Sequence, residues 1–186
     1  MRVIAGSLKG RRLHAPSWPG LRPTSDKLRE TIFNILAPRI PGANVLDGYA
    51  GTGALGIEAL SRGAAAVTFV ERDRRAHALI AENLARCGIA EGYAIIRDSV
   101  TRALEALHDH PPDRTFDVVL FDPPYAIDDD DLDAAVAAAG ELMTGDGILV
   151  VEHARRRSAP QGRGRLVRTR DVTAGDSALA LYACRP

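Results

Sequence analysis

A rigid turn that could bind a planar amino group follows the apolar residues 118–120. The turn reads Phe121-Asp122-Pro123-Pro124-Tyr125. Its prolines donate no main-chain hydrogen bonds and fix φ near about −65°, and the first of them favours an extended Asp122. Asp122 and the Pro123 carbonyl can therefore accept hydrogens from an amine while Tyr125 stacks on the ring that carries it. Asp122, Pro123, Pro124 and Tyr125 are the candidate catalytic residues.

A glycine-rich loop earlier in the chain could hold the reactive partner of that amine. Gly51, Gly53 and Gly56 spell G-x-G-x-x-G, and Glu71 follows Gly51 by about 20 residues, as in dinucleotide sites. Asp47, four positions before Gly51, argues against a pyrophosphate, because an acid beside the loop would repel a doubly negative group. S-adenosylmethionine has no phosphate and carries a cationic amino-acid end and a cationic sulfonium. S-adenosylmethionine is therefore the predicted cofactor, and no metal is expected.

A third acid, Asp98, could accept a hydrogen bond from the adenine amino group of that cofactor. Each acid also has a simpler interpretation: Asp98 could cap the next helix, and Glu71 could be a surface acid beside Arg72. The glycines could serve only a tight turn. The candidate cofactor residues are Asp47, Tyr49, Ala50, Gly51, Gly53, Glu71, Arg72, Asp98 and Ser99.

The elements that must position these residues alternate regularly from residue 43 onwards. Apolar strands are predicted at 45–46, 66–70, 93–96, 116–121 and 148–151, and helices at 54–61, 74–86, 99–107 and 132–143. Residues 165–172 and 178–183 are predicted to form a C-terminal antiparallel hairpin. The alternation predicts an α/β, Rossmann-like fold with a mostly parallel seven-stranded sheet covered on both faces. The acids at the strand ends should then meet at one edge.

A basic segment precedes this domain. Residues 2–5 and 11–14 are predicted as two short strands of a β-hairpin, followed by a proline-rich linker that contains Trp18. Thr24 or Ser25 should cap a helix that runs to about Leu36. We therefore expect residues 1–23 to be an RNA-contacting arm and residues 24–186 to be the catalytic domain. Alternatively, the hairpin could simply cap the core.

Charge is balanced in number but segregated along the chain. Lys and Arg total 24 and Asp and Glu total 24, yet basic residues gather before residue 30 and between 155 and 170. Such blocks suggest a basic face for a polyanion, although a solvated arginine-rich surface is the alternative. Arg155, Arg156 and Arg157 are additional candidates for phosphate contacts. The main candidate RNA contacts are Lys9, Arg11, Arg12, Arg22, Thr24, Lys27 and Arg29.

The composition is that of an ordinary globular protein, with 46% hydrophobic and 26% charged residues. No long apolar segment or signal peptide is visible, so a cytoplasmic protein without membrane association is expected. Cys87 and Cys184 lie far apart and should be reduced thiols. A monomer is the simplest expectation.

The order Asp47-x-x-x-Gly51-x-Gly53, Glu71, Asp122-Pro-Pro-Tyr125 resembles class I S-adenosylmethionine-dependent amino-methyltransferases. Residues 2–6, 10–13, 21–34 and 53–64 resemble more narrowly the bacterial RsmD family. This resemblance spans nearly the whole chain and implies methylation of the exocyclic N2 of a guanine in 16S ribosomal RNA. The substrate would be that RNA, alone or in a partly assembled small subunit, and the product S-adenosylhomocysteine. Three residues depart from the family pattern, namely Gly48, Thr52 and Ala174, and Gly48 puts the rigidity of the cofactor loop in question.

Three other functions fit some of the same motifs. An adenine N6-methyltransferase for DNA or RNA would share every catalytic residue, but a DNA enzyme would be expected to carry a separate recognition domain. A non-catalytic adenosyl-binding RNA module would be expected to have a broken Asp-Pro-Pro-aromatic stretch, which is intact here. A nicotinamide oxidoreductase would need the pyrophosphate that Asp47 disfavours.

Overall fold

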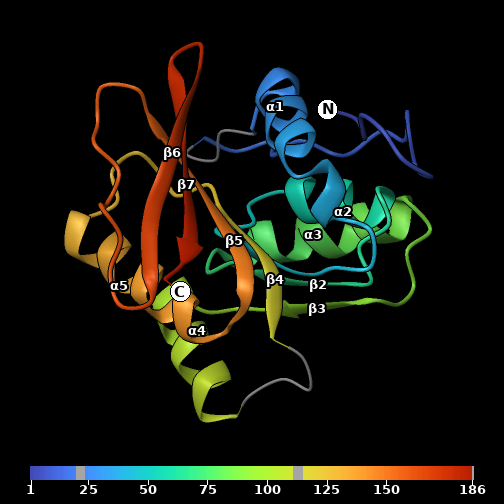
Figure 1. Ribbon diagram of the computed structural model, residues 1–186. Coiled ribbons are helices and arrows are strands. Elements are labelled where there is room, and N and C mark those ends of the chain that lie inside the picture. The colour runs from blue at the N-terminus through green and yellow to red at the C-terminus, as the bar shows by residue number, and fades with distance from the viewer. Residues whose placement is uncertain (20–23, 111–114, 186) are drawn as a thin grey trace.

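The computed structural model describes residues 1–19, 24–110 and 115–185. Its centre is a seven-stranded sheet in the order β3-β2-β1-β4-β5-β7-β6 (Figure 1). The pairs among β1 to β5 are parallel, whereas β7 is antiparallel to both of its neighbours. The strands are β1 (Asn44–Gly48), β2 (Ala66–Val70), β3 (Tyr93–Ile96), β4 (Phe116–Phe121), β5 (Met143–Ala154), β6 (Leu166–Ala174) and β7 (Ser177–Cys184).

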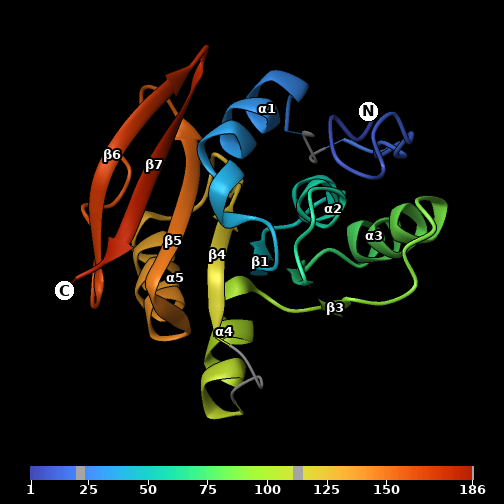
Figure 2. The same ribbon diagram turned by 45° about the vertical axis from the view of Figure 1, so that its right-hand side comes forward.

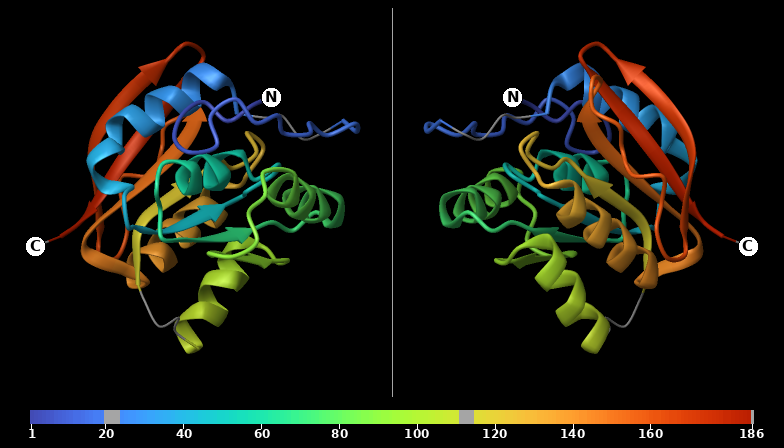
Figure 3. Two further views of the ribbon diagram at one scale, coloured as in Figure 1. Left: turned by 90° about the vertical axis from the view of Figure 1, so that its right-hand side faces the viewer. Right: turned by 90° about the vertical axis from the view of Figure 1, so that its left-hand side faces the viewer.

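Helices cover both faces of the sheet and enclose two apolar cores (Figures 2 and 3). Side chains of β4 alternate between them: Val118 and Leu120 pack with the helices at 26–35, 54–61 and 74–86, whereas Val119 and Phe121 pack with those at 100–109 and 129–141. Double-sided burial explains the continuous apolar runs of the strands. No helix in the described ranges is long and apolar enough to cross a bilayer. The helices are α1 (Asp26–Ile35), η1 (Ala37–Arg39), α2 (Ala54–Ser61), α3 (Arg74–Arg86), α4 (Val100–Asp109) and α5 (Asp129–Glu141).

The predicted α/β fold is confirmed, with one helix displaced from its expected position. α5 begins at Asp129 rather than residue 132, because the Asp128 side chain accepts a hydrogen bond from the Asp130 N–H. Three aspartates in the first turn also suit the positive end of the helix dipole. The helix ends at Glu141, because Met143 already belongs to β5.

The two limbs of the N-terminal segment pair antiparallel, as the expected hairpin requires, but they form no regular strands at 2–5 and 11–14. Among the described residues, one isolated bridge joins Arg2 to Arg12. Main-chain bonds also join its two limbs, from the Val3 N–H to the Arg11 carbonyl at 2.9 Å and from the Leu13 N–H to the Met1 carbonyl at 3.0 Å. The segment bonds to α2 as well: the N–H groups of Ile4 and Ala5 donate to Glu58 at 2.7 and 3.0 Å. Val3 and Leu13 join the core, so the segment also caps it, as the alternative interpretation predicted.

Gly6 and Ser61 show how closely this segment approaches α2. Gly6 has a φ of 80°, and a Cβ atom there would lie 1.8 Å from the Ser61 carbonyl oxygen. The Ser7 N–H donates to that oxygen at 2.7 Å, and the Leu8 N–H donates to the Ser61 hydroxyl at 3.0 Å. A glycine is therefore required at the closest contact, both by its φ and by the space available.

A buried ionic cluster joins α1, α2 and the N-terminal segment. Arg29 is fully buried, lies 2.6 Å from Asp26 and 3.9 Å from Glu58, and donates to the Arg2 carbonyl at 2.7 Å. Arg62 donates to the other oxygen of Glu58 at 2.7 Å. Because an unpaired buried charge is costly, this cluster fixes the position of α1 relative to the segment.

Candidate active site

A cavity of about 820 Å³ opens where the carboxyl ends of β1, β2, β4 and β5 meet. Its volume is that of a site for a small organic ligand, and its position is the switch point where the strand order reverses between β1 and β4. Trp18 lines its rim, with the Arg75 guanidinium 4.9 Å from its ring centre. The candidate cofactor and catalytic residues in its lining are Tyr49, Ala50, Gly51, Glu71, Arg72, Asp98, Ser99, Asp122, Pro123, Pro124 and Tyr125.

Glu71 is fixed at the cofactor side of this cavity by main-chain groups. Its Oε2 accepts from the Gly51 N–H and its Oε1 from the Asp73 N–H, each at 2.8 Å. Glu71 is 8% exposed, so its interpretation as a loose surface acid is wrong. The carboxylate and the glycine loop therefore form one rigid edge, where ribose hydroxyls could donate.

Asp98 also lines the cavity, and it does not cap α4. Ser99 is the N-cap, because its hydroxyl accepts from the Arg102 N–H, whereas Asp98 accepts from the adjacent Ser99 N–H at 2.8 Å. The capping interpretation of Asp98 is therefore wrong. Its half-buried carboxylate is placed to accept a hydrogen bond from a ligand amino group.

Asp47 and Gly53 lie beneath the loop and not in the cavity lining. Asp47 is fully buried, and its Oδ2 accepts from the Gly56 N–H at 2.8 Å. Its Oδ1 has no hydrogen-bond partner among the described residues. Burial raises the pKa of Asp47 well above its ordinary value, and nearby Asp122 and Glu71 raise it further, against the Gly56 hydrogen bond. An electronegative pocket of this kind fits a cationic ligand such as S-adenosylmethionine.

Gly48 and Tyr49 pack against Phe121 at the base of the cavity. Gly48 pairs with Val70 on one side and Phe121 on the other, and a Cβ on it would lie 2.5 Å from the Phe121 ring. The Tyr49 ring contacts the same ring edge-on, with 5.5 Å between centres. Gly48 therefore makes room for Phe121 while its backbone is held by pairing on both sides. Burial raises the pKa of Tyr49 to about 12, so its hydroxyl is neutral at physiological pH.

The candidate catalytic turn lines the same cavity and is held by contacts that the sequence did not reveal. The Thr24 hydroxyl donates to Asp122 Oδ2, so Thr24, expected at the RNA, lies at the active site. The Tyr125 hydroxyl lies 3.1 Å from Glu152 Oε1 and 3.2 Å from the Ser177 hydroxyl. Glu152 could have been found, because it is a polar residue that closes the apolar run 148–151. No local pattern marks Ser177.

Arg157 clamps the loop that follows the catalytic turn. Its guanidinium donates to the carbonyls of Tyr125 and Ile127 at 3.0 and 2.6 Å, and it also pairs with Asp129. The Arg157 guanidinium, which was a candidate for a phosphate contact, is therefore already paired with acceptors inside the protein. Arg155 and Arg156 are exposed.

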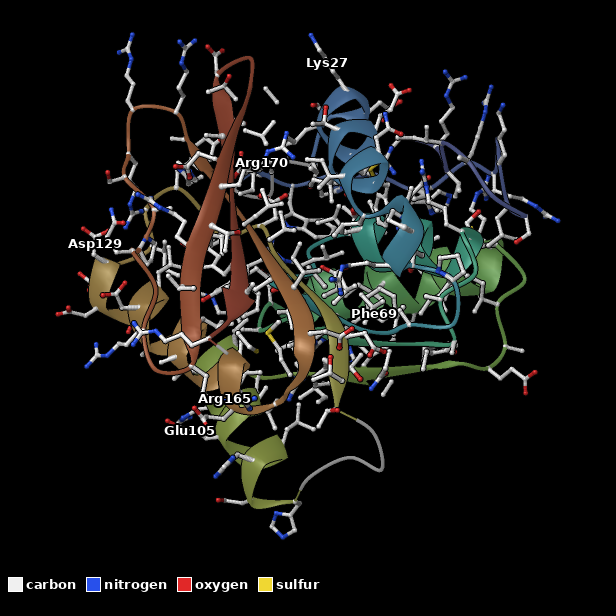
Figure 4. All side chains as sticks on the ribbon, viewed as in Figure 1. Lys27, Phe69, Glu105, Asp129, Arg165 and Arg170 are labelled. Carbon is white, nitrogen blue, oxygen red and sulfur yellow. The ribbon has the colours of Figure 1, made fainter. Side chains whose placement is uncertain are left out.

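The predicted RNA contacts divide into exposed and buried groups. Lys27 points outward from the outer end of α1 (Figure 4). Arg29 is fully buried against Asp26 and Glu58, so its assignment as an RNA contact is wrong. Arg22 lies outside the described residues. The remaining candidates, which are exposed, are Lys9, Arg11 and Arg12.

The strand order, with antiparallel β7 between β5 and β6, and the site at the carboxyl edge define the class I methyltransferase fold. The solved structure of yhhF, a candidate methyltransferase of Escherichia coli, has a TM-score of 0.82 and 30% sequence identity, over 99% of this chain and 97% of that one. The family model described as "Conserved hypothetical protein 95" matches residues 1–183.

Two curated relatives narrow the class. YlbH of Bacillus subtilis, named as a candidate rRNA methyltransferase, is 39% identical over 187 residues and aligns along the whole length of both chains. Ribosomal RNA small subunit methyltransferase D of Escherichia coli is 44% identical over 125 residues, which are 67% of this chain and 60% of that protein. The match thus spans less than two thirds of the E. coli protein. The chain belongs to this family, the RsmD family that its motifs resemble.

Proposed function

We propose that the protein transfers a methyl group from S-adenosylmethionine to the exocyclic N2 of a guanine in 16S ribosomal RNA. The observation that carries the proposal is the single cavity that joins the Gly51–Glu71 edge to Asp122 and Tyr125. The names of the relatives support a ribosomal RNA substrate of the small subunit. The choice of guanine N2 rests on the resemblance of residues 21–34 to the family. An adenine N6 enzyme remains the second candidate, because it would use the same turn.

The cofactor, when bound, supplies an electrophilic methyl group on a cationic sulfur. Glu71 would accept hydrogen bonds from its ribose hydroxyls and Asp98 from its adenine amino group. The buried Asp47 charge would favour its cationic amino-acid end through the loop above it. The remaining candidates for holding it are Tyr49, Ala50, Gly51, Gly53, Arg72 and Ser99.

Asp122 would orient the attacking amine. The lone pair of guanine N2 is delocalised into the ring, so the amine is a weak nucleophile until its hydrogens are held. Asp122 and the Pro123 carbonyl accept those hydrogens, and the Thr24 hydroxyl fixes one Asp122 oxygen in place. The nitrogen would form its bond to the methyl carbon as the methyl–sulfur bond breaks, with neutral S-adenosylhomocysteine as the leaving group. It would then lose one proton, which Asp122 can accept. Tyr125 stacks on the base, a contact worth about 1–3 kcal/mol.

The exposed basic residues of the N-terminal segment would bind the RNA around the target. Lys9, Arg11 and Arg12 can contact phosphates, together with Lys27 at the start of α1. The segment is thus proposed as the RNA-contacting part, and residues 24–186 as the catalytic domain. A base inside folded RNA must also be extruded before it reaches Asp122.

The Asp122→Asn variant tests the chemistry. We expect methyl transfer to 16S RNA to fall by about 10²–10⁴-fold, because the amide cannot take the proton, whereas S-adenosylhomocysteine affinity should change little. Radiolabelled methyl transfer and ligand titration measure the two quantities. Asp109→Asn, exposed at the end of α4, is the control. Near-normal turnover of Asp122→Asn would refute the mechanism. Mapping methylated guanines in RNA from cells that lack the protein tests the target.

A further inference from the structure

Glu152 is a buried carboxylate beside the half-buried Asp122. Phe121 of β4 pairs in register with Val151 of β5, and this is the last pair between the two parallel strands. Asp122 and Glu152 are the residues that follow it, Asp122 just after β4 and Glu152 still within β5. Both residues line the same cavity. Glu152 is only 3% exposed, so its carboxylate is almost completely removed from bulk water.

The two oxygens of Glu152 have different environments. Oε1 faces the Tyr125 hydroxyl at 3.1 Å, whereas Oε2 is buried and has no hydrogen-bond partner in the part of the chain that the structure describes. Arg157, the cation that lines the neighbouring small pocket, donates to the carbonyls of Tyr125 and Ile127 and to Asp129 instead. A buried acceptor left without a donor is unfavourable, because it has lost its hydrogen bonds to water. This arrangement suits an oxygen that receives its hydrogen from a ligand.

The position of Glu152 identifies the kind of donor. It lies next to the turn that would hold the target base, whereas the cofactor residues Gly51 and Glu71 follow β1 and β2. Two adjacent carboxylates repel phosphate and favour a neutral edge with neighbouring N–H donors. The Watson–Crick edge of guanine has the N1 hydrogen directly beside the N2 amino group. Adenine carries an acceptor at N1.

We infer that Glu152 Oε2 accepts the N1 hydrogen of the target guanine while Asp122 holds its N2 amino group. Glu152 would thereby be the residue that selects guanine and rejects adenine, whose N1 lone pair would face a carboxylate. The inference rests on the proposed function. It assigns base selection to Glu152 and leaves methyl transfer to the catalytic turn.

The test compares guanine with 2-aminopurine, which keeps the 2-amino group but has no hydrogen on N1. Small-subunit RNA carrying either base at the mapped position is made by splinted ligation, reconstituted into subunits, and methylated under single-turnover conditions. We expect the wild-type protein to prefer guanine by more than about tenfold, because 2-aminopurine leaves Oε2 unpaired. In Glu152→Gln the amide can accept from guanine N1 or donate to 2-aminopurine N1. The preference should therefore fall to within about threefold.

Tyr125→Phe is the matched control, because it removes the contact with Glu152 Oε1 but leaves Oε2 in place. Its preference for guanine should remain even if its rate falls. Equal wild-type rates on the two bases would overturn the inference without any variant, as would a Glu152→Gln protein that keeps the full preference. If the wild-type protein methylates neither substrate, the proposed function fails as well. If it methylates guanine and discriminates independently of Glu152, only the present inference fails.

Discussion

Asp47 shows that the most informative acid in the sequence is not a surface ligand. It was expected beside the ligand, yet it is buried under the glycine loop with one oxygen hydrogen-bonded to Gly56. An ionised carboxylate there is unfavourable in the ligand-free protein, because burial disfavours the charged form. The same charge would favour a cationic ligand above it. We therefore expect the Asp47 charge to lower the free energy of unfolding and to raise the affinity for S-adenosylmethionine.

The Asp47→Asn variant tests both effects, on stability and on cofactor affinity. The native pKa of Asp47 lies above its unfolded value of about 3.9, so stability from this group is lost as pH rises from about 4 through the native pKa. The neutral variant avoids that loss. We expect its thermal midpoint to exceed that of the wild type by about 2–4 °C at pH 7 and by less at pH 5. S-adenosylmethionine affinity should fall. A variant that is less stable at both pH values would contradict the prediction.

Gly48 and Phe121 form a size-matched pair, which gives a second prediction at this scale. A Cβ on residue 48 would lie 2.5 and 2.7 Å from two Phe121 ring carbons. Gly48→Ala should therefore cost about 1–3 kcal/mol of unfolding free energy. Adding Phe121→Leu should recover part of that cost, because the smaller side chain leaves room for the methyl group. Urea denaturation of both single variants and the double variant measures this coupling. Strictly additive effects would show that the two residues do not clash.

At the scale of elements, the loop between β4 and α5 is a positioned structure rather than a free connection. Arg157, from the chain after β5, donates to two carbonyls of this loop and pairs with the first residue of α5. The buried His153 ring lies 2.8 Å from the Arg157 carbonyl and helps to fix its backbone. The chain that follows β5 thus holds the candidate catalytic turn that follows β4.

Substituting Arg157 should loosen that turn. We expect Arg157→Ala to lower kcat by about tenfold, with faster hydrogen exchange at residues 125–129. Arg157→Lys should be intermediate, because an ammonium group cannot form the planar fork of a guanidinium. The exposed neighbour Arg156, replaced by Ala, is the control. Equal increases of KM in both variants, with unchanged kcat, would indicate phosphate contacts instead.

Much of the fold and of the site could be predicted from the sequence, because short-range patterns encode them. A polar residue that closes a buried apolar run is visible directly, which is how Asp47, Glu71 and Asp122 were found. The contact of Thr24 with Asp122 joins residues 98 positions apart, and no local pattern encodes it. The burial of Arg29 depends on where α2 places Glu58 in space. The N-terminal limbs pair only over a short stretch, because the N–H groups of Ile4 and Ala5 donate to Glu58 of α2 and do not extend the pairing.

At the scale of the whole molecule, the net charge is zero but positive charge is concentrated in the N-terminal segment. The exposed residues Lys9 and Arg11 lie in the N-terminal segment, whereas Arg39 and Arg185 lie near the amino ends of the parallel strands, opposite the cavity. Phosphate binding should therefore depend on where a positive charge lies rather than on the total.

Salt dependence of RNA binding tests that distribution. Replacing Lys9 and Arg11 by Ala should weaken binding to all RNA sequences alike and reduce the slope of log K against log salt by about 0.7–0.9 per lost phosphate contact. Replacing Arg39 and Arg185 by Ala removes the same charge and should leave the slope unchanged. Filter binding between about 50 and 200 mM salt measures both. Equal slopes for the two double variants would show a general charge effect.

The anchorage of the N-terminal segment has a consequence for how this enzyme can evolve. Glu58 and Arg29 hold the segment through the N–H groups of Ile4 and Ala5 and the carbonyl of Arg2, groups that every non-proline residue possesses. Most side chains of the segment can thus be exchanged without detaching it, provided that Gly6 and the apolar Val3 and Leu13 remain. Mutation can accordingly change the proposed RNA contacts of the segment without altering the proposed catalytic turn. A change of target site would then require new side chains in the segment, while its main-chain bonds to Glu58 and Arg29 stay the same.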